Sequence, residues 1–405
     1  GYKNVWCPNA ILFHYESSTQ SKEKDTLIRD RRLSNIDTLY KKWNSYIEPN
    51  YLYEFINNTS GLYCHSKTKI AFAVTDAGSD VAAGDYFTAL ELAGALEKNG
   101  FECSFVTRKN ESWYNLDKEV DILISMLDSL DLYKLKSPSD SLIKIAWIRN
   151  WPYRWLENPS LKSYDILYAS SKILCDIIED NAGVAVEFMP IATNSERFNR
   201  RMNKNEANTS DVVFSGNYWG KEREIQKYLD TKKVSFNFHV YGKGWEAVPK
   251  LEKYHKGFLS YKDMPKAYAN TKIVIDDAVE GITKPFGSVN SRVFDAIASG
   301  ALVITNGDIG AQELFGDLLP TFMNGEEMHR QISHYLQNEN QRISLVKKLQ
   351  GIILRKHSYR LRSDQIKGSL KRKLKIKPRI AIKIPSPTWH EAESWGDYHL
   401  ARGLK

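Results

Sequence analysis

The first half of the chain alternates short apolar segments with longer amphipathic ones. Residues 69–74 (KIAFAV) form a continuous apolar run, which predicts a buried strand, and residues 86–96 repeat apolar positions at helical spacing. Further strands are predicted from similar runs at 101–107, 120–126, 143–148 and 165–169. Strands that alternate with helices in this way predict a parallel, doubly wound sheet.

The same alternation restarts after a polar segment, residues 203–210 (NKNEANTS), whose composition is typical of a connection between domains. Beyond it, strands are predicted at 211–215, 236–241, 272–275 and 301–305. The expected fold is therefore α/β, with two Rossmann-like domains of doubly wound parallel sheet in tandem. Ligands of such sheets bind at the carboxyl ends of the strands, so we expect the active site in a cleft between the two domains.

The two ends of the chain do not follow this alternation. Residues 379–404 instead echo residues 69–96, because both contain Ile-Ala, a strand pattern and then Gly-Asp-Tyr, once at 84–86 and once at 396–398. Such a repeat predicts the start of a further similar module. We therefore predict an N-terminal tail with a linker, two Rossmann-like domains, a basic helix or linker, and a further module, at residues 1–65, 66–202, 203–355, 356–378 and 379–405.

Composition and charge narrow the class of protein. Hydrophobic residues make up 42% and charged residues 26% of the chain, as in soluble globular proteins. The net charge of +8 is local: residues 355–379 hold eleven Lys or Arg and one acid, which gives +10 and leaves −2 for the rest. A nucleic-acid partner is therefore not expected. The basic stretch is either a solvated helix end or a contact for an anionic membrane surface.

Location follows from what the sequence lacks. No segment approaches the roughly 18 apolar residues of a membrane span, and no export leader is recognisable. The spacing of the four cysteines fits neither a metal site nor a disulfide framework. We expect a cytoplasmic protein, alternatively one held peripherally at the inner face of the plasma membrane. The cysteines are Cys7, Cys64, Cys103 and Cys175.

The loop between the first strand and the first helix is small and glycine-containing, residues 76–84 (DAGSDVAAG). Glycine there permits close backbone approach and the helix start favours an anion, although a plain tight turn explains the loop as well. The spacing is not that of a dinucleotide fingerprint. Gly84 is a candidate binding residue for a second substrate. Asp85 is either a helix N-cap or a catalytic carboxylate that orients an acceptor.

Aromatic and cationic residues gather after the fourth strand, in 147–155 (WIRNWPYRW). Aromatic faces stack on sugar rings, and Arg and Asn donate to hydroxyls or phosphate. The alternative is that several of these tryptophans belong to the core. We predict an acceptor site there, formed by Arg149, Asn150, Trp151 and Arg154.

The second domain carries two glycine turns after its first two strands. Gly216 and Asn217 are followed by Lys221 and Arg223, a pattern that predicts a diphosphate cradle or, alternatively, surface cations on an exposed helix. The second turn, with Gly242 and Lys243, is expected beside a base or ribose.

The most specific segment is 284–300 (KPFGSVNSRVFDAIASG), followed by a buried strand. It resembles the donor-binding stretch of group-one, GT-B glycosyltransferases. The resemblance covers roughly residues 69–355 and implies an N-terminal acceptor domain and a C-terminal donor domain. By position, Asp295 matches the second glutamate of the family motif, which binds the nucleotide ribose.

This segment departs from the family pattern at one position. The first glutamate, which contacts the transferred sugar, falls on Gly287 here. The resemblance is then to the spore-maturation-type branch, whose motif runs asparagine-x-arginine-x-phenylalanine, and Ser288, Asn290 or Arg292 would supply the contact. Lys284 at its start is a further expected donor-binding residue.

A weaker resemblance concerns residues 8–20 (PNAILFHYESSTQ), which are similar to the final segment of family-two rhamnosyltransferase-like domains. His14 and Glu16 would line the active site of that preceding module. The chain would then be a piece of a multi-module polysaccharide glycosyltransferase, with adjacent glycosyltransferase modules as partners.

The resemblance implies a metal-independent hexosyl- or rhamnosyltransferase. It would move a sugar from a nucleotide-diphosphate donor to a glycan or lipid-linked glycan acceptor of a bacterial surface polysaccharide, an O-antigen or capsule. Lys221, Arg223 and Arg292 would stabilise the departing diphosphate, with Asp85 and Arg292 catalytic. No cofactor and no metal are expected, and Asp276-Asp277 is interpreted as a loop or cap. Two alternatives stay open: a catalytically inactive GT-B scaffold module, and a sugar-nucleotide epimerase of the same fold.

Overall fold

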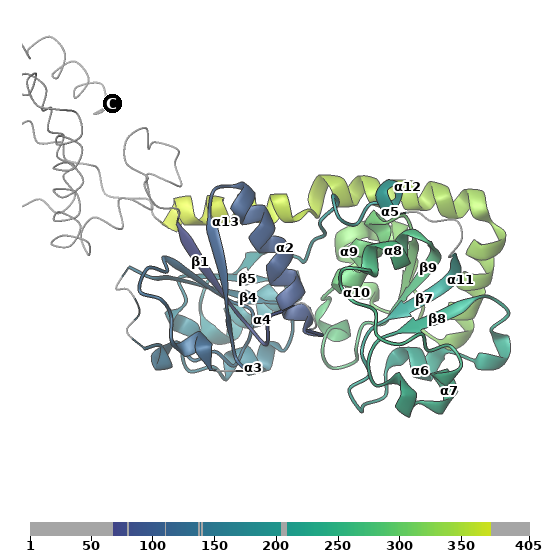
Figure 1. The fold of residues 1–405 in the computed structure, drawn as a ribbon, viewed down its shortest axis with the longest axis horizontal. Coiled ribbons are helices and arrows are strands. Elements are labelled where there is room, and N and C mark those ends of the chain that lie inside the picture. The colour runs from purple at the N-terminus through teal and green to yellow at the C-terminus, as the bar shows by residue number, and fades with distance from the viewer. Residues whose placement is uncertain are drawn as a thin grey trace, which may run out of the picture. The chain divides into compact units, whose positions relative to one another are not determined.

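The computed structural model describes residues 68–78, 81–109, 111–136, 138, 141–203 and 209–373 (Figure 1). The predictions for residues 1–65, including His14 and Glu16, and for residues 379–405 lie outside this part of the chain. The compact unit of residues 67–366 contains two parallel sheets.

The first sheet has six parallel strands in the order β2-β1-β3-β4-β5-β6. Its interior strand β1 is entirely apolar after Lys69, and residues 70–74 are 0% exposed because helices cover both faces of a sheet of this kind. The strands are β1 (Lys69–Val74), β2 (Glu102–Thr107), β3 (Ile122–Ser125), β4 (Ile143–Ile148), β5 (Ile166–Ala169) and β6 (Glu187–Phe188). The helices of this half are α2 (Gly84–Lys98), α3 (Pro152–Leu156) and α4 (Lys172–Ala182), with 3-10 turns at Ser112–Tyr114, Leu132–Lys134 and Leu161–Ser163.

The second sheet has four parallel strands in the order β10-β9-β7-β8. They are β7 (Ser210–Ser215), β8 (Phe238–Tyr241), β9 (Thr271–Asp276) and β10 (Leu302–Thr305). The helices are α5 (Arg200–Asn203), α6 (Glu224–Tyr228), α7 (Pro249–Glu252), α8 (Met264–Ala269), α9 (Ser291–Ala298), α10 (Asp308–Phe315), α11 (Gly325–Gln337) and α12 (Glu339–Lys356), with 3-10 turns at Thr231–Lys233, Trp245–Ala247, Lys284–Phe286 and Gly316–Leu318. The predicted α/β architecture with two doubly wound parallel sheets is confirmed.

The chain passes between the two halves twice, and the two passages are hydrogen-bonded to each other. The amide of Thr193 donates to the carbonyl of His357 (3.1 Å), and the amide of Tyr359 donates to the carbonyl of Thr193 (3.2 Å). Helix α13 (Tyr359–Lys373) then returns beside α2 of the first half (Figure 1), where Asn99 Nδ2 donates to Ser363 Oγ at 2.8 Å. Residues 193 and 357–359 thus form one paired connection between the two halves, which is called the hinge below.

Candidate functional site

Each sheet reverses its strand order at one point. In the first sheet β1 lies between β2 and β3, and in the second β7 lies between β8 and β9. Successive strands are therefore added on opposite sides of β1 and of β7. Loops leave such a point in opposite directions and open a crevice at the carboxyl ends of the strands. The candidate site of the second half accordingly lies where β7 and β9 end, at Ser215 and Asp276.

Two arginines and two aspartates meet at these strand ends. Arg223 binds Asp277 through two hydrogen bonds, Nε to Oδ2 at 3.0 Å and Nη2 to Oδ1 at 2.5 Å. Arg292 donates from Nη1 to Asp276 Oδ1 (2.7 Å) and from Nε to the carbonyl of Ser215 (2.6 Å). The cluster carries two positive and two negative charges. The loop or cap interpretation of Asp276-Asp277 is therefore wrong, because both are buried counterions of the arginines.

Further donors fix the Asp276 carboxylate. Thr305 Oγ1 donates to Oδ2 at 2.7 Å, and Asn290 Nδ2 donates to Oδ1 at 3.0 Å. Burial disfavours the Arg292 cation, but the carboxylates of Asp276 and Asp277 outweigh this, so the pKa of Arg292 is raised. A fully charged guanidinium is thus held in one position at the strand ends, as an anion site requires.

The Gly216 turn lies directly against this cluster. A Cβ at Gly216 would be 2.9 Å from Arg292 Nη2, so a larger residue would displace this guanidinium, whereas its 3.5 Å distance to Arg223 Nη2 is an ordinary contact. Its carbonyl accepts from Trp245 Nε1 at 2.6 Å. A Cβ at Gly242, where φ is 143°, would lie 2.1 Å from the same carbonyl oxygen. The two predicted glycine turns therefore interlock.

Asn217 links these turns to the first half. Its Oδ1 accepts from the amide of Lys243 (2.9 Å), and its Nδ2 donates to the carbonyl of Ala82 (3.5 Å), which precedes α2. The turn does not lie at a helix N-terminus as expected, because helix α6 begins only at Glu224 and has five residues. The turn instead offers backbone beside two arginines.

The predicted lysines lie at the margin of the site. Lys221 is exposed, and the exposed Lys243 places Nζ 4.6 Å from the ring centroid of Phe258. Lys284 pairs with Glu280 at 3.2 Å.

The segment after Lys284 contacts the first half. Gly287 adopts a φ of 66°, which a larger residue would hold only under strain. Ser171 Oγ, at the start of α4, donates to the carbonyl of Phe286 at 2.5 Å. Ser170 Oγ lies 3.3 Å from Ser288 Oγ, and Ser288 is buried. In this conformation Ser288 is part of the contact between the two halves.

Asp295 faces the hinge. Its Oδ1 accepts from Thr193 Oγ1 at 2.6 Å, and the residue is 6% exposed. Burial raises the pKa of its carboxyl well above the usual range, and the Glu91 carboxylate adds to this effect. Sequence reasoning found the residue from its motif, but not its partner, which lies 102 positions earlier in the chain.

In the first half, Asp85 and Arg149 lie near the carboxyl ends of β1 and β4. Asp85 Oδ2 accepts from the amide of Thr75 at 2.6 Å. Ala83 occupies the N-cap position of helix α2 and the helix begins at Gly84, so Asp85 lies within the first turn and its interpretation as the N-cap is wrong. Gly84 is exposed. Arg149 Nη2 donates to the carbonyl of Met126 (2.9 Å), its Nε is buried without a hydrogen-bond partner, and burial lowers its pKa.

The aromatic and cationic segment 147–155 separates into core residues and residues that are at least partly exposed. Trp147 and Trp155 are 0% and 1% exposed, so these two belong to the core. Trp151 is half-buried and holds a left-handed backbone conformation (φ 54°, ψ 52°), which is uncommon for a bulky residue and typical of functional sites. The Arg154 guanidinium lies 5.0 Å from the Trp151 ring centroid. Asn150 beside it is half-buried.

Within the described ranges, no group of three or more His, Cys, Asp or Glu residues could hold a metal ion. None of the helices there is long and apolar enough to cross a membrane.

The fold with two parallel α/β sheets matches that of GT-B glycosyltransferase structures. Residues 221–368 match the family model described as glycosyl transferase-like. A search of the curated proteins found no match.

Solved structures similar to this chain include the Anabaena protein HepE in complex with UDP-glucose. The likeness has 11% identity, covers 75% of this chain and 99% of HepE, and has a TM-score of 0.55. An α-glucosyltransferase in complex with UDP and a 13-mer DNA containing a HMU base is 10% identical, over 76% of this chain and 100% of that one, at a TM-score of 0.56. T4 phage BGT in complex with UDP and Mn²⁺ is 13% identical, over 76% of this chain and 100% of that one, at a TM-score of 0.51.

Proposed function

We propose that this chain transfers a sugar from a uridine-diphosphate donor to an acceptor hydroxyl. The observation that carries the proposal is the position of Arg223 and Arg292, which flank the Gly216 backbone at the strand-order reversal of the glycosyltransferase-like half. The choice of uridine rests on the three similar structures, which were solved with UDP or UDP-glucose.

Electrostatic stabilisation of the leaving diphosphate is the proposed source of catalysis. As the bond between the anomeric carbon and the phosphate oxygen breaks, negative charge develops on the diphosphate. The acceptor oxygen forms the new bond to that carbon, and its proton passes to the Asp85 carboxylate. Arg292, aided by Arg223, is already fixed by Asp276 and Asp277, so no reorganisation is needed when this charge appears. Lys221 and Lys243 at the margin would add charge toward the phosphates.

On the acceptor side, the proposal assigns Asp85, Arg149 and Trp151 to orientation of the incoming hydroxyl. Trp151 offers an aromatic face in a strained backbone, and Arg149 offers a buried Nε without a partner. Such a donor group is costly to bury unless a ligand satisfies it.

The finer assignments rest on the sequence. The NxRxF pattern around Arg292 supports a transferase of the spore-maturation-type branch that uses a hexose or rhamnose. The segments at both ends support a multi-module enzyme of bacterial surface polysaccharide synthesis, active without metal and located in the cytoplasm. The acceptor would be a glycan or a lipid-linked glycan. Because one similar structure contains DNA, DNA belongs in the acceptor screen.

Titration calorimetry with UDP, ADP and UDP-glucose tests the donor assignment. We expect UDP and UDP-glucose to bind and Lys221→Gln/Lys243→Gln to weaken both by about tenfold, since charge-assisted contacts are lost. The matched control is Lys162→Gln/Lys232→Gln, which removes two exposed lysines elsewhere. Absence of nucleotide binding to the folded wild-type chain would overturn the proposal.

Product analysis with an acceptor library separates the proposal from its alternatives. Transfer of label from UDP-sugar to an acceptor supports the enzyme. Binding with neither transfer nor hydrolysis would indicate the inactive scaffold module, and conversion of the donor to its epimer without any acceptor would indicate the epimerase.

A further inference from the structure

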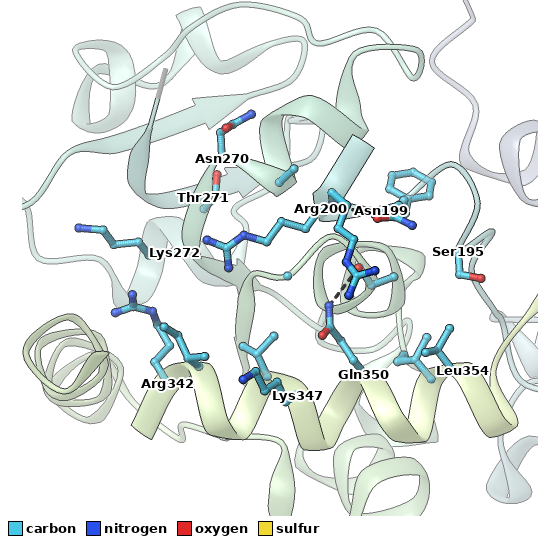
Figure 2. A pocket seen from close by; sticks show the side chains of 18 of the residues that line it. Ser195, Asn199, Arg200, Asn270, Thr271, Lys272, Arg342, Lys347, Gln350 and Leu354 are labelled. Carbon is cyan, nitrogen blue, oxygen red and sulfur yellow. Dashed lines mark hydrogen bonds between the residues drawn. The ribbon is translucent and has the colours of Figure 1, made fainter. Parts of the chain in front are cut away.

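A cavity of about 770 Å³ opens beside the second sheet (Figure 2). It is bounded by the start of β9, by the connection that leads into α5, and by one face of α12. Thr271 and Lys272 line it, whereas Asp276, at the other end of the same strand, belongs to the arginine cluster. A strand rises about 3.3 Å per residue, so roughly 17 Å separate the two places. The cavity is a second site rather than an extension of the first.

The described lining of this cavity is strongly basic: it has five cationic side chains and one acid, Glu339. Two of the cations are neutralised, because Arg342 donates to Glu339 at 3.1 Å and Lys272 pairs with Asp211 at 2.7 Å. The other three are exposed and form no ion pair with any residue in the described part of the chain. They are Arg200, Arg201 and Lys347.

The α12 wall of the cavity is apolar around these cations. Ile343, Lys347, Gln350 and Leu354 follow each other at helical spacings of three and four, so they share one face of the helix. Figure 2 shows Lys347 and Gln350 on the side of α12 that faces Arg200. Leu354 is 61% exposed. The site thus combines unpaired positive charge with exposed hydrocarbon.

We propose that this cavity binds an amphiphilic phosphate ester. The phosphoryl group accepts from Arg200, Arg201 and Lys347, and the hydrocarbon chain lies along Ile343 and Leu354 of α12. Guanidinium and ammonium groups bind phosphate through charge-assisted hydrogen bonds, and each buried methylene adds a favourable transfer free energy. The inference is independent of the proposed transferase activity, because no residue of the arginine cluster takes part.

Calorimetry with the full chain and n-octyl phosphate tests this site, with inorganic phosphate and 1-octanol as the two partial ligands. We expect octyl phosphate to bind at least tenfold more tightly than either. Arg200→Gln/Arg201→Gln/Lys347→Gln should weaken octyl phosphate by about tenfold or more and leave UDP binding unchanged. Leu354→Ser should weaken octyl phosphate severalfold and leave inorganic phosphate unchanged.

The matched control, Lys118→Gln/Lys162→Gln/Lys232→Gln, removes the same charge from exposed positions outside the cavity. Equal loss in this control and in the cavity variant would overturn the proposal, since the effect would then reflect net charge alone. Equal affinity for inorganic phosphate and octyl phosphate would also overturn it, because the apolar wall would play no part. Circular dichroism of each variant verifies that it is folded.

Discussion

Arg223 and Asp277 form a two-bond ion pair whose side chains are only 5% and 1% exposed. The pair joins the residue that precedes α6 to the residue that follows β9, 54 positions apart. Buried pairs of this kind contribute little net stability by themselves, but breaking one leaves a charge without a partner in a medium of low polarity. Removal of either Arg223 or Asp277 alone is therefore expected to destabilise the site.

Asp277→Asn should lower the free energy of unfolding by about 3 to 5 kcal/mol, because Arg223 then stays buried without a counterion. Urea denaturation followed by circular dichroism measures the change. The control removes an exposed pair: Lys98→Ala, whose partner Glu196 has a 76% exposed side chain, should leave the midpoint almost unchanged. Similar small effects of both substitutions would show that Asp277 is not a required counterion.

Asp295 can be tested for two roles at once. Asp295→Ala should remove the acceptor of the Thr193 hydroxyl and lower stability by about 1 to 3 kcal/mol. Asp295→Asn keeps an acceptor oxygen and avoids the burial of charge, so it should be stable. If the carboxylate binds the ribose when a nucleotide is present, the Asn variant should still lose about tenfold or more in UDP affinity. Unchanged affinity in the folded Asn variant would leave Asp295 a hinge residue only.

Substitution of Trp151 by Asn should weaken acceptor binding but change stability little. Asn tolerates the left-handed backbone conformation, so Trp151→Asn relieves strain while losing ring burial, and the net change should stay within about 1 kcal/mol. Loss of aromatic stacking should weaken the sugar acceptor about threefold to tenfold. Trp151→Ala keeps the strain and should be the less stable variant. Full acceptor affinity in the Asn variant would remove the ring from the acceptor site.

Transfer should persist after extensive chelation by EDTA, because the proposed stabilisation of the diphosphate comes from Arg223, Arg292 and Lys221. Initial rates with EDTA, Mg²⁺ and Mn²⁺ measure this. Mn²⁺ is the informative addition, since T4 phage BGT was solved with it. An absolute requirement for a divalent ion would contradict the assignment of the charge to these side chains.

The lowered pKa of His357 predicts that the folded protein loses stability in mild acid. Burial, and then the charge of Arg362, lower its pKa to about 4. In the unfolded chain the histidine takes up a proton below about pH 6.5, whereas in the folded chain it stays neutral down to about pH 4. The contribution of His357 to the free energy of unfolding is therefore fully present above pH 6.5, and it falls by about 3 kcal/mol in total between pH 6.5 and 4.

Urea denaturation of the wild type and of His357→Gln at pH 7, 5.5 and 4.5 isolates this effect. The Gln variant retains an acceptor for Arg362, which donates to His357 Nδ1 at 3.0 Å, but it does not titrate. Its stability should fall less steeply as the pH decreases. Parallel pH profiles of the two proteins would show that His357 is not the responsible group.

The strands were predictable because their signal is local. The run at 69–74 is apolar at nearly every position and coincides with β1, and the run at 272–275 lies inside β9 (Thr271–Asp276). A parallel sheet covered on both faces imposes this composition on each of its central strands. The same reasoning missed β6, which has two residues, Glu187 and Phe188, and therefore no pattern.

The partners within the site were not predictable because they are remote in sequence. The motif around Arg292 was found, but its counterion Asp276 lies 16 positions earlier, at the end of a different element. A pair of acids directly after a buried strand, where parallel strands end, was the available signal. Likewise, nothing in the spacing of Trp147, Trp151 and Trp155 tells which faces the core, because β4 and α3 bury two of them from different directions.

The paired passage of the chain at Thr193 and residues 357–359 also constrains biosynthesis. The first half receives part of its surface from α13, since Gln365 Nε2 donates to the carbonyl of Phe188 at 2.9 Å and Arg362 Nε donates to that of Pro190 at 2.6 Å. A ribosome adding about 5 to 20 residues per second delivers these partners roughly 10 to 35 s after β6 has been made. Until then, the first half of the nascent chain lacks the helix that covers this part of its surface. Its folding can be completed only when the second half has also been synthesised.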